Sequence, residues 1–196
     1  MKARICGVLI AVAAAFCAVA PAARADLSSA LNPFGEYYNN IPRAAKANDV
    51  AKIRSLLDSG YSPNQTDEDG ATTGLHVAAG TGNLQILAIL YKAGGNINQR
   101  DPVGSTPLDY AAEHDHLEAL NLLLDVGAKV DAENKNGMTP LMFAAKSGDI
   151  DAVRALLAHG ANPNQLDYTG RDAASWAREG RHQAAVEFLN AAAHKH

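Results

Sequence analysis

One short phrase of this 196-residue chain recurs at intervals of 33 residues. Its best copies run Gly-Ser-Thr-Pro-Leu-Asp-Tyr-Ala-Ala at 104–112 and Gly-Met-Thr-Pro-Leu-Met-Phe-Ala-Ala at 137–145. A shorter copy lies at 73–79, and a worn copy lies at 170–177. Leucines at positions 90, 123, 156 and 189 keep the same interval. Because a period held at several independent positions does not arise from composition, we predict a row of similar structural units.

Each unit is predicted to contain two helices. Thr106 before Pro107 marks the start of one, because a threonine oxygen caps free N–H groups and proline tolerates the first helical position. Asp115 occupies the place of a glycine in two sister units, so it is expected to end this first helix in a left-handed or turn geometry. Leucines at 117, 120, 123 and 124 give the second helix its apolar stripe, and Gly127 ends it. The polar segment at 128–137 is then suited to a hairpin-like finger.

These recurring segments resemble the ankyrin repeat, whose unit reads Thr-Pro-Leu-His-x-Ala-Ala, then Gly, then Val-x-x-Leu-Leu-x-x-Gly-Ala-x-x-Asn. The resemblance covers residues 41–196. It implies an all-α solenoid of stacked helix-turn-helix units with hairpin-like finger loops. A single helix pair cannot bury its own apolar face, so stability has to come from stacking. The units are expected at 41–66, 67–99, 100–132, 133–165 and 166–196.

Three departures from the pattern carry expectations of their own. The first unit lacks Thr-Pro-Leu-His and is followed after 34 residues, so the finger at 67–72 should be one residue longer than its sisters. Gly74 replaces the proline that starts the first helix, which predicts a looser first turn. The last unit carries the polar outer face that a C-terminal cap requires, at Arg178, Glu179, Arg181 and Glu187.

Residues 1–25 have the organisation of a secretory signal peptide. Two basic residues precede an apolar run at 5–20, and Ala23-Arg24-Ala25 fits the small-x-small cleavage rule, so the mature chain is expected to begin at Asp26. The alternative is an uncleaved anchoring helix, although a run of 16 residues is short for a span that needs about 20. Residues 26–40 then form either an N-terminal cap over the first repeat or a loose arm.

The expected cleavage also changes the composition of the mature chain. Both cysteines, Cys6 and Cys17, lie in the removed segment, which excludes thiol catalysis and zinc-thiolate sites. The remainder has 14 basic and 21 acidic residues. This balance argues against nucleic acid and anionic membrane surfaces as partners. We expect an exported protein without membrane insertion, in a bacterial periplasm, with an extracellular fate left open.

No catalytic motif accompanies the repeats, so the chain is predicted to be no enzyme and to need no cofactor or metal. The resemblance implies that His76, in the Thr-Pro-Leu-His position, ties neighbouring loops together. The alternative function is a metal-binding or enzymatic protein that uses Glu113, His114 and His116. The favoured interpretation of that cluster is a solvated group facing a partner.

A second pattern of 33 residues has larger apolar side chains. Val77, Tyr110, Phe143 and Trp176 could form an aromatic binding stripe, but the resemblance implies that this position packs in the core between the two helices. We therefore interpret these four residues as core.

The resemblance places a partner on the concave face made by finger tips and the exposed side of the first helices. Val103, Met138 and Tyr168 are the expected anchors, against the alternative that single exposed apolar residues are ordinary. The candidate partner-binding residues are Thr81, Pro102, Val103, Ser105, Glu113, His114, Lys135, Asn136, Met138, Lys146, Ser147, Tyr168 and Arg171.

The function expected from these observations is a non-enzymatic, exported module that binds a partner protein and is itself a monomer. A structural module that assembles with itself is the alternative for the oligomeric state. Exported bacterial proteins of this kind include some that support a periplasmic enzyme, such as a catalase in oxidative-stress defence. Others act as immunity proteins, so the resemblance implies either support or inhibition of an enzyme.

Overall fold

The computed structural model describes residues 40–68 and 70–193. The chain divides into Met1–Tyr38 and Asn39–His196, and the account below concerns the second unit. The predicted signal peptide at 1–25 and all but the last residue of the predicted cap or arm at 26–40 lie outside the described residues.

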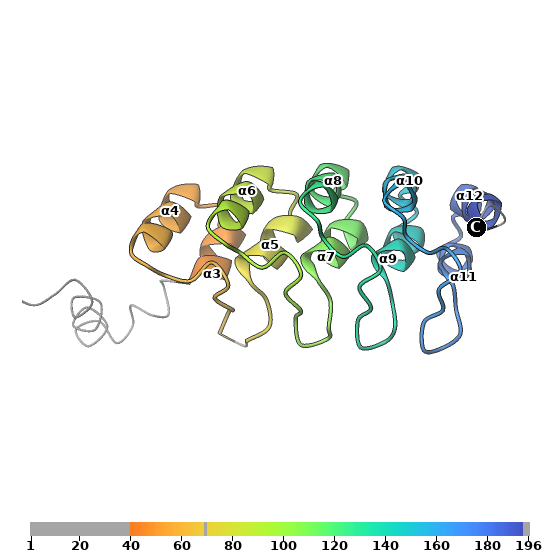
Figure 1. Cartoon of the computed structure of the whole chain (residues 1–196), viewed down its shortest axis with the longest axis horizontal. Coiled ribbons are helices and arrows are strands. Elements are labelled where there is room, and N and C mark those ends of the chain that lie inside the picture. Colours follow the sequence, from red (N-terminus) through yellow and green to blue (C-terminus); the bar gives the residue numbers. More distant parts are fainter. Residues whose placement is uncertain (1–39, 69, 194–196) are drawn as a thin grey trace, which may run out of the picture. The chain divides into compact units, whose positions relative to one another are not determined.

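The described part of the chain is all-helical, which confirms the predicted fold class. Its helices form five pairs that lie side by side in one row (Figure 1). The first helices of the pairs lie in one layer and the second helices in another, and the four connecting fingers leave from the same side (Figure 1). The helices are α3 (Ile41–Lys46), α4 (Val50–Asp58), α5 (Gly74–Gly80), α6 (Leu84–Lys92), α7 (Pro107–Glu113), α8 (Leu117–Asp125), α9 (Pro140–Ser147), α10 (Ile150–Ala158), α11 (Ala173–Glu179) and α12 (Gln183–Ala193).

The helix ends follow the local signals in the sequence. The Thr106 side chain caps α7 by accepting a hydrogen bond from the Asp109 N–H. Asp49 and Asn83 cap the second helices α4 and α6 in the same way. Asp115 has a φ of 59°, so the predicted left-handed end of the first helix in its unit is confirmed.

Alanine pairs allow neighbouring first helices to approach closely. The pairs at 78–79, 111–112 and 144–145 are fully buried, and α5 contacts α7 while α7 contacts α9. Leucines of the same helices, such as Leu108 and Leu141, are fully buried beside them. The inner first helices α5, α7 and α9 therefore bury side chains against both neighbours, and the core is continuous along the row.

Polar side chains connect the loops that follow the second helices. The side-chain oxygen of Asn98 accepts the Lys129 N–H at 2.8 Å, and that of Asp131 accepts the Asn162 N–H at 3.1 Å. One unit earlier, the Asn64 oxygen accepts the Asn96 N–H at 2.6 Å. This row of bonds explains why Asn or Asp recurs at this position of the repeat: its short side chain satisfies a backbone donor of the next unit.

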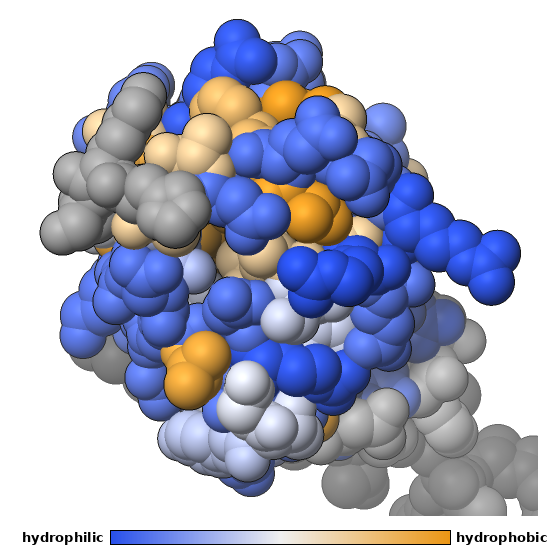
Figure 2. Space-filling model, turned by 90° about the vertical axis from the view of Figure 1, so that its right-hand side faces the viewer, coloured by the Kyte–Doolittle hydropathy of each residue, from blue (hydrophilic) through white to orange (hydrophobic). Residues whose placement is uncertain are grey.

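The C-terminal end of the row has the polar surface predicted for a cap. Arg178, Glu179, Arg181 and Glu187 are all exposed on or beside α11 and α12. Figure 2, which views the molecule from this end, shows hydrophilic residues over most of the surface with apolar residues between them.

Gly74 has a packing role that the pattern alone did not indicate. Helix α5 begins at Gly74 in spite of the missing proline, and Thr73 and His76 form a capping box around its first turn. A Cβ atom on Gly74 would lie 2.7 Å from Ile41 Cγ2 and 2.7 Å from Leu90 Cδ1. The glycine is therefore required because two buried side chains occupy the space of a larger residue.

We predict that Gly74→Pro, which restores the family phrase, destabilises the protein. The expected loss is roughly 1–3 kcal/mol in the free energy of unfolding, because the ring overpacks the contact with Ile41 and Leu90. Urea denaturation followed by circular dichroism measures it. Ala173→Pro, at the equivalent position of the last unit, is the matched control and should change stability little. Equal or higher stability of Gly74→Pro would contradict the packing argument.

Candidate functional site

Four fingers project from the row on the side of the first helices (Figure 1). We define finger one as residues 67–72, finger two as 101–105, finger three as 134–138 and finger four as 167–171. In each, the N–H of the first residue donates to the carbonyl of the last at 2.9 Å. Finger one has one residue more between these ends than its sisters, which confirms the longer first finger predicted from the 34-residue spacing.

The first side chain of each finger holds its loop in shape. Asp101 Oδ1 accepts the N–H groups of Val103 and Ser105 at 2.9 and 2.8 Å, and the residues equivalent to Asp101 in fingers three and four accept bonds in the same way. For Asp167, burial raises the pKa, but hydrogen bonds from Thr169 and Arg171 outweigh it and lower the pKa overall. These carboxylates and amides are thus structural, and they make each finger a fixed turn.

Fingers two, three and four are also bonded to one another. The Lys135 N–H donates to the Val103 carbonyl at 2.9 Å, and the Tyr168 N–H donates to the Asn136 carbonyl at 3.0 Å. Pro102 holds the corresponding position of finger two, where it lacks the N–H to make such a bond to finger one. Fingers two to four therefore form one bonded row.

Two apolar side chains are exposed on this row. Val103 is 56 % exposed and Tyr168 is 71 % exposed. The Tyr168 ring is positioned against finger three, since a Cβ on Gly137 would lie 2.6 Å from its Cδ1, and its hydroxyl donates to Glu133 Oε2 at 3.3 Å. A large side chain that is exposed but already held in place loses little conformational entropy when a partner covers it.

The aromatic register on the first helices supports the fingers from below. Phe143 and Trp176 are buried, while Val77 and Tyr110 are partly buried against the core, so the core interpretation of this register is confirmed. In addition, the Tyr110 hydroxyl donates to Asp101 Oδ2 at 2.9 Å, and Trp176 Nε1 donates to Asp167 Oδ2 at 3.1 Å. These bonds were not predicted from the sequence, although the Tyr hydroxyl and the Trp indole N–H usually need a partner when buried and could have indicated them.

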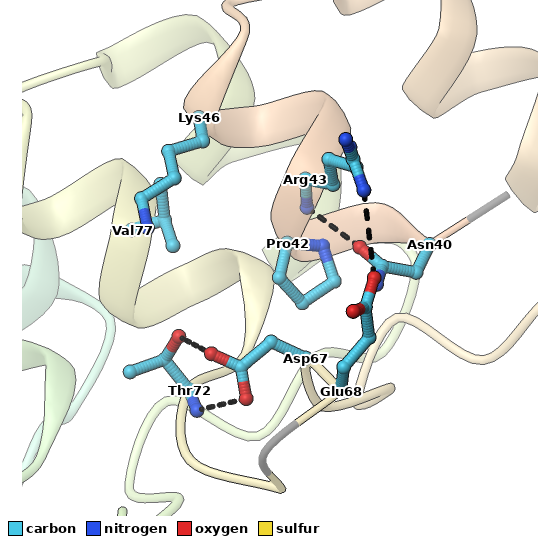
Figure 3. Close-up of a pocket in the computed structure, with 8 residues that line it drawn as sticks. All are labelled: Asn40, Pro42, Arg43, Lys46, Asp67, Glu68, Thr72 and Val77. Carbon is cyan, nitrogen blue, oxygen red and sulfur yellow. Dashed lines mark hydrogen bonds and ion pairs between the residues drawn. The ribbon is translucent and has the colours of Figure 1, made fainter. Parts of the chain in front are cut away.

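The first hollow, of about 320 Å³, lies at the base of finger one (Figure 3). Val77 occupies the aromatic register position of its first helix but has no polar group that could bond to Asp67. Asp67 instead accepts a hydrogen bond from the Thr72 hydroxyl at 2.8 Å. Arg43 of α3 pairs with Glu68 of finger one at 3.5 Å across the hollow. Its lining residues are Asn40, Pro42, Arg43, Lys46, Asp67, Glu68, Thr72 and Val77.

A second hollow, of about 220 Å³, lies between fingers three and four. Arg171 lies over the Trp176 ring, with its Cζ 3.8 Å from the ring centroid. Lys146 of α9 also approaches this ring, with its Nζ 5.4 Å from the centroid. The lining residues are Lys135, Asn136, Met138, Asp167, Tyr168, Thr169, Arg171 and Trp176.

Comparison with known proteins matches the repeats to one family. A family model of ankyrin repeats, described as three copies, matches residues 42–134 and 126–196. The chain is an ankyrin-repeat protein. The predicted solenoid is therefore supported by both the helix arrangement and the family model, and ankyrin repeats indicate a protein–protein interaction module.

Individual relatives cover only part of the chain. An ankyrin repeat-containing protein of Schizosaccharomyces pombe is 45 % identical over 69 residues, which are 35 % of this chain and 33 % of that protein. A putative ankyrin repeat protein of Rickettsia bellii is 33 % identical, over 35 % of this chain and 38 % of its own length. The potassium channel GORK of Arabidopsis thaliana is 40 % identical over 29 % of this chain and 7 % of its own. The chain thus spans less than two fifths of each of these relatives.

The candidate partner-binding residues of this ankyrin-repeat protein fall into three groups. Two expectations are wrong: Ser105 and Met138 are each only 6 % exposed. They are the last residues of their fingers, where the chain turns back into the stack, so neither projects as an anchor, although Met138 lines the second hollow. Ser147 and Arg171 are partly exposed. The exposed candidates are Thr81, Pro102, Val103, Glu113, His114, Lys135, Asn136, Lys146 and Tyr168.

The alternative metal-binding cluster is not assembled. The His114 ring stacks on Tyr110, and its Nδ1 lies 3.0 Å from the carbonyl of that residue. The His116 ring points into the preceding ankyrin repeat, where its Nε2 lies 3.2 Å from the Gly80 carbonyl. No group of three metal-ligating side chains occurs among the residues that the structure describes. The two histidines and Glu113 therefore do not converge on one point in the described structure.

Within the described ranges, no helix has both the length and the apolarity to cross a membrane. This finding does not extend to the predicted signal segment.

His76 has the structural role that the family resemblance implied. Its Nδ1 lies 2.9 Å from the Thr73 hydroxyl, and its Nε2 lies 3.2 Å from the Ser105 carbonyl in the next finger. Burial lowers the pKa of His76, so the ring is neutral near pH 7 and carries one proton for these contacts.

Asp109 takes the place of that histidine in the next ankyrin repeat. It is 1 % exposed; its Oδ2 accepts hydrogen bonds from the Thr106 N–H and hydroxyl, while its Oδ1 has no hydrogen-bond partner within the described structure. Burial raises the pKa of Asp109 to about 7. A shorter side chain thus cannot repeat the bridge that His76 makes to the next finger, and it leaves a buried carboxyl that favours its neutral form.

We predict that Asp109 makes stability fall as pH rises. Its pKa is higher in the folded state, so the folded state holds more protons between about pH 4 and 7, and the free energy of unfolding decreases across this window and levels above it. The slope is at most about 1.4 kcal/mol per pH unit. Denaturation curves of the wild type and Asp109→Asn, which lacks the titration, measure the difference between pH 4 and 8.

His76 acts in the opposite direction, since its lowered pKa costs stability as pH falls below its unfolded value. It is present in both proteins, so the difference between them isolates Asp109. A difference that does not change with pH would contradict the assignment.

Proposed function

We propose that this ankyrin-repeat protein is an exported, non-enzymatic module that holds one partner protein against its finger row and first-helix face. It acts as a monomer, and its partner is an enzyme of the same compartment that it supports or inhibits. The compartment is a bacterial periplasm.

The observation that carries the binding proposal is the bonded row of fingers two to four. Backbone hydrogen bonds hold this row together, and Val103 and Tyr168 project from it with most of their surface exposed. Fixed aromatic and aliphatic side chains surrounded by polar neighbours are the usual anchors of protein interfaces. By contrast, the buried polar groups Asp101, Asp167 and His76 are all engaged in hydrogen bonds within the stack.

The export part of the proposal rests on the N-terminal sequence. A basic start, an apolar run at 5–20 and the Ala23-Arg24-Ala25 site form the expected signal, and both cysteines lie within it. The loss of this segment leaves an acidic chain without thiols, which suits an oxidising compartment.

We expect the mature protein to begin at Asp26. Mass spectrometry of the protein purified from a bacterial host that expresses the full-length gene should identify this N-terminus in the periplasmic fraction. Ala25→Arg, which destroys the small residue before the cut, should block processing. An intact N-terminus on a periplasmic or cytoplasmic wild-type protein would contradict the proposal of cleavage.

We predict that a photo-crosslinking phenylalanine analogue at position 168 captures one dominant partner in the organism's cell envelope. The same analogue at Tyr91, a 39 % exposed aromatic on the second-helix layer, is the matched control and should capture none. The adduct should disappear when Val103→Asp is added, because a charge replaces the second anchor, while circular dichroism stays unchanged.

Equal capture from positions 168 and 91 would show that the finger row is not the interface. A crosslinked dimer of the chain itself would support self-assembly in place of a separate partner, and light scattering across concentration would then show the dimer.

A further inference from the structure

The hollow between fingers three and four combines aromatic surface with cationic side chains. Tyr168 and Trp176 provide the rings, and Arg171 lies over the Trp176 ring at 3.8 Å. Lys135 lines the hollow, and Lys146 approaches Trp176 from α9. All these residues belong to the fourth and fifth repeats, so the site is formed only where two neighbouring units meet.

Two lysines lie at this site: Lys135 lines the hollow, and Lys146 approaches its Trp176 ring. Neither Lys135 nor Lys146 forms a salt bridge with another described residue. Arg171 differs, because it forms an ion pair with Glu179 and lies 3.8 Å from Asp167. The Asp167 carboxylate that also lines the hollow lies beside Arg171, so Lys135 in the lining and Lys146 beside Trp176 are the cations left for an external anion.

Glu133, which precedes finger three, is engaged by hydrogen bonds. Glu133 accepts hydrogen bonds from Gln165 Nε2 at 2.5 Å and from the Tyr168 hydroxyl at 3.3 Å. Glu133 forms no ion pair with Lys135 or Lys146 in the described structure, so both lysines can meet an external anion. A ligand that brings carboxylates thus meets charge complementarity and needs to displace no internal ion pair.

The rest of the chain limits which anion fits. The formal net charge of the whole sequence is −4, so the field beyond the hollow repels an extended polyanion such as nucleic acid or an anionic membrane. A few carboxylates on a compact loop interact with the nearby lysines only, because charges beyond about 8 Å are screened at physiological salt. A loop also carries apolar groups that can cover the exposed Tyr168 ring.

We infer that the hollow between fingers three and four receives an Asp- or Glu-bearing loop of the partner protein, with Lys135 and Lys146 as its charge partners and Tyr168 as its apolar contact. This inference rests on the proposed function and adds the chemistry of the partner to it. The finger bonds fix the backbone that carries Lys135 and Tyr168 before the partner arrives, so this part of the contact is pre-organised.

Trp176 makes the site directly measurable, because it is the only tryptophan of the chain. The probe is N-acetylated, C-amidated hexaglutamate, with hexaglutamine as the neutral control peptide. Titration is followed by Trp176 fluorescence and by calorimetry, since a change at Lys146 alters the starting fluorescence. Hexaglutamate should bind the wild type and weaken with added salt, whereas hexaglutamine should not bind.

The Lys135→Glu/Lys146→Glu variant should lose about tenfold or more in affinity for hexaglutamate. The matched control is Lys92→Glu/Lys129→Glu, which makes the same change in net charge with two exposed lysines of the second-helix side. It should retain the wild-type affinity to within about twofold, because its charges lie outside the hollow.

Three results would overturn the inference. These are unchanged affinity in Lys135→Glu/Lys146→Glu, an equal loss in both variants, and tighter binding of a single-stranded DNA of the same charge.

The crosslinked partner of position 168 distinguishes failure of the acidic-loop inference from failure of the proposed function. If Lys135→Glu/Lys146→Glu still captures it as well as the wild type, the proposed function stands and the acidic loop is wrong. If position 168 of the wild type captures no partner, the proposed function itself fails.

Discussion

The burial of the first helices between their neighbours is the interaction on which the rest of the structure depends. Fully buried alanine pairs, such as 111–112, allow α7 to approach both α5 and α9. A seven-residue helix is too short to be stable alone in water, so its order comes from this packing. The spacing of units also decides the spacing of the fingers, because each finger lies between the second helix of one unit and the first helix of the next.

Hydrogen bonds then convert this regular spacing into a rigid surface. The bonds from Lys135 to Val103 and from Tyr168 to Asn136 join successive fingers, and bonds from Tyr110 and Trp176 attach fingers two and four to the helices beneath. Loops of this kind are normally the mobile part of a protein. Here most of the polar groups that would favour motion are used within the row, so exposed side chains sit on fixed backbone.

Small differences between repeats give the surface its individuality. His76 bridges to the next finger, while Asp109 in the same register leaves a buried oxygen without a partner. Pro102 ends the finger bonding at finger two. Met142 fills the histidine position in the next unit with an apolar side chain that is 1 % exposed. The same backbone therefore carries different electrostatics along its length, with lysines that form no ion pair to a described residue at one end of the finger row.

The repeat period was sufficient to predict the helix pairs, the left-handed residue Asp115 and the longer finger one, because these depend on local backbone chemistry and on counting residues. It was not sufficient for Ser105 and Met138. Their register on the fingers suggested exposure, but the chain turns inward there and buries both. The family phrase also suggested a defect at Gly74, whereas Ile41 and Leu90 occupy the space that a proline would need.

The sequence by itself therefore determined the architecture of this protein: the number of stacked units, their helix ends and the relative lengths of their fingers. Only the tertiary structure decided which side chains remain exposed and which charges remain unpaired. The physical reason is that periodicity reports contacts repeated in every unit, whereas exposure and pairing at positions such as Lys135 and Lys146 depend on side chains of neighbouring units. Those neighbours differ from one repeat to the next.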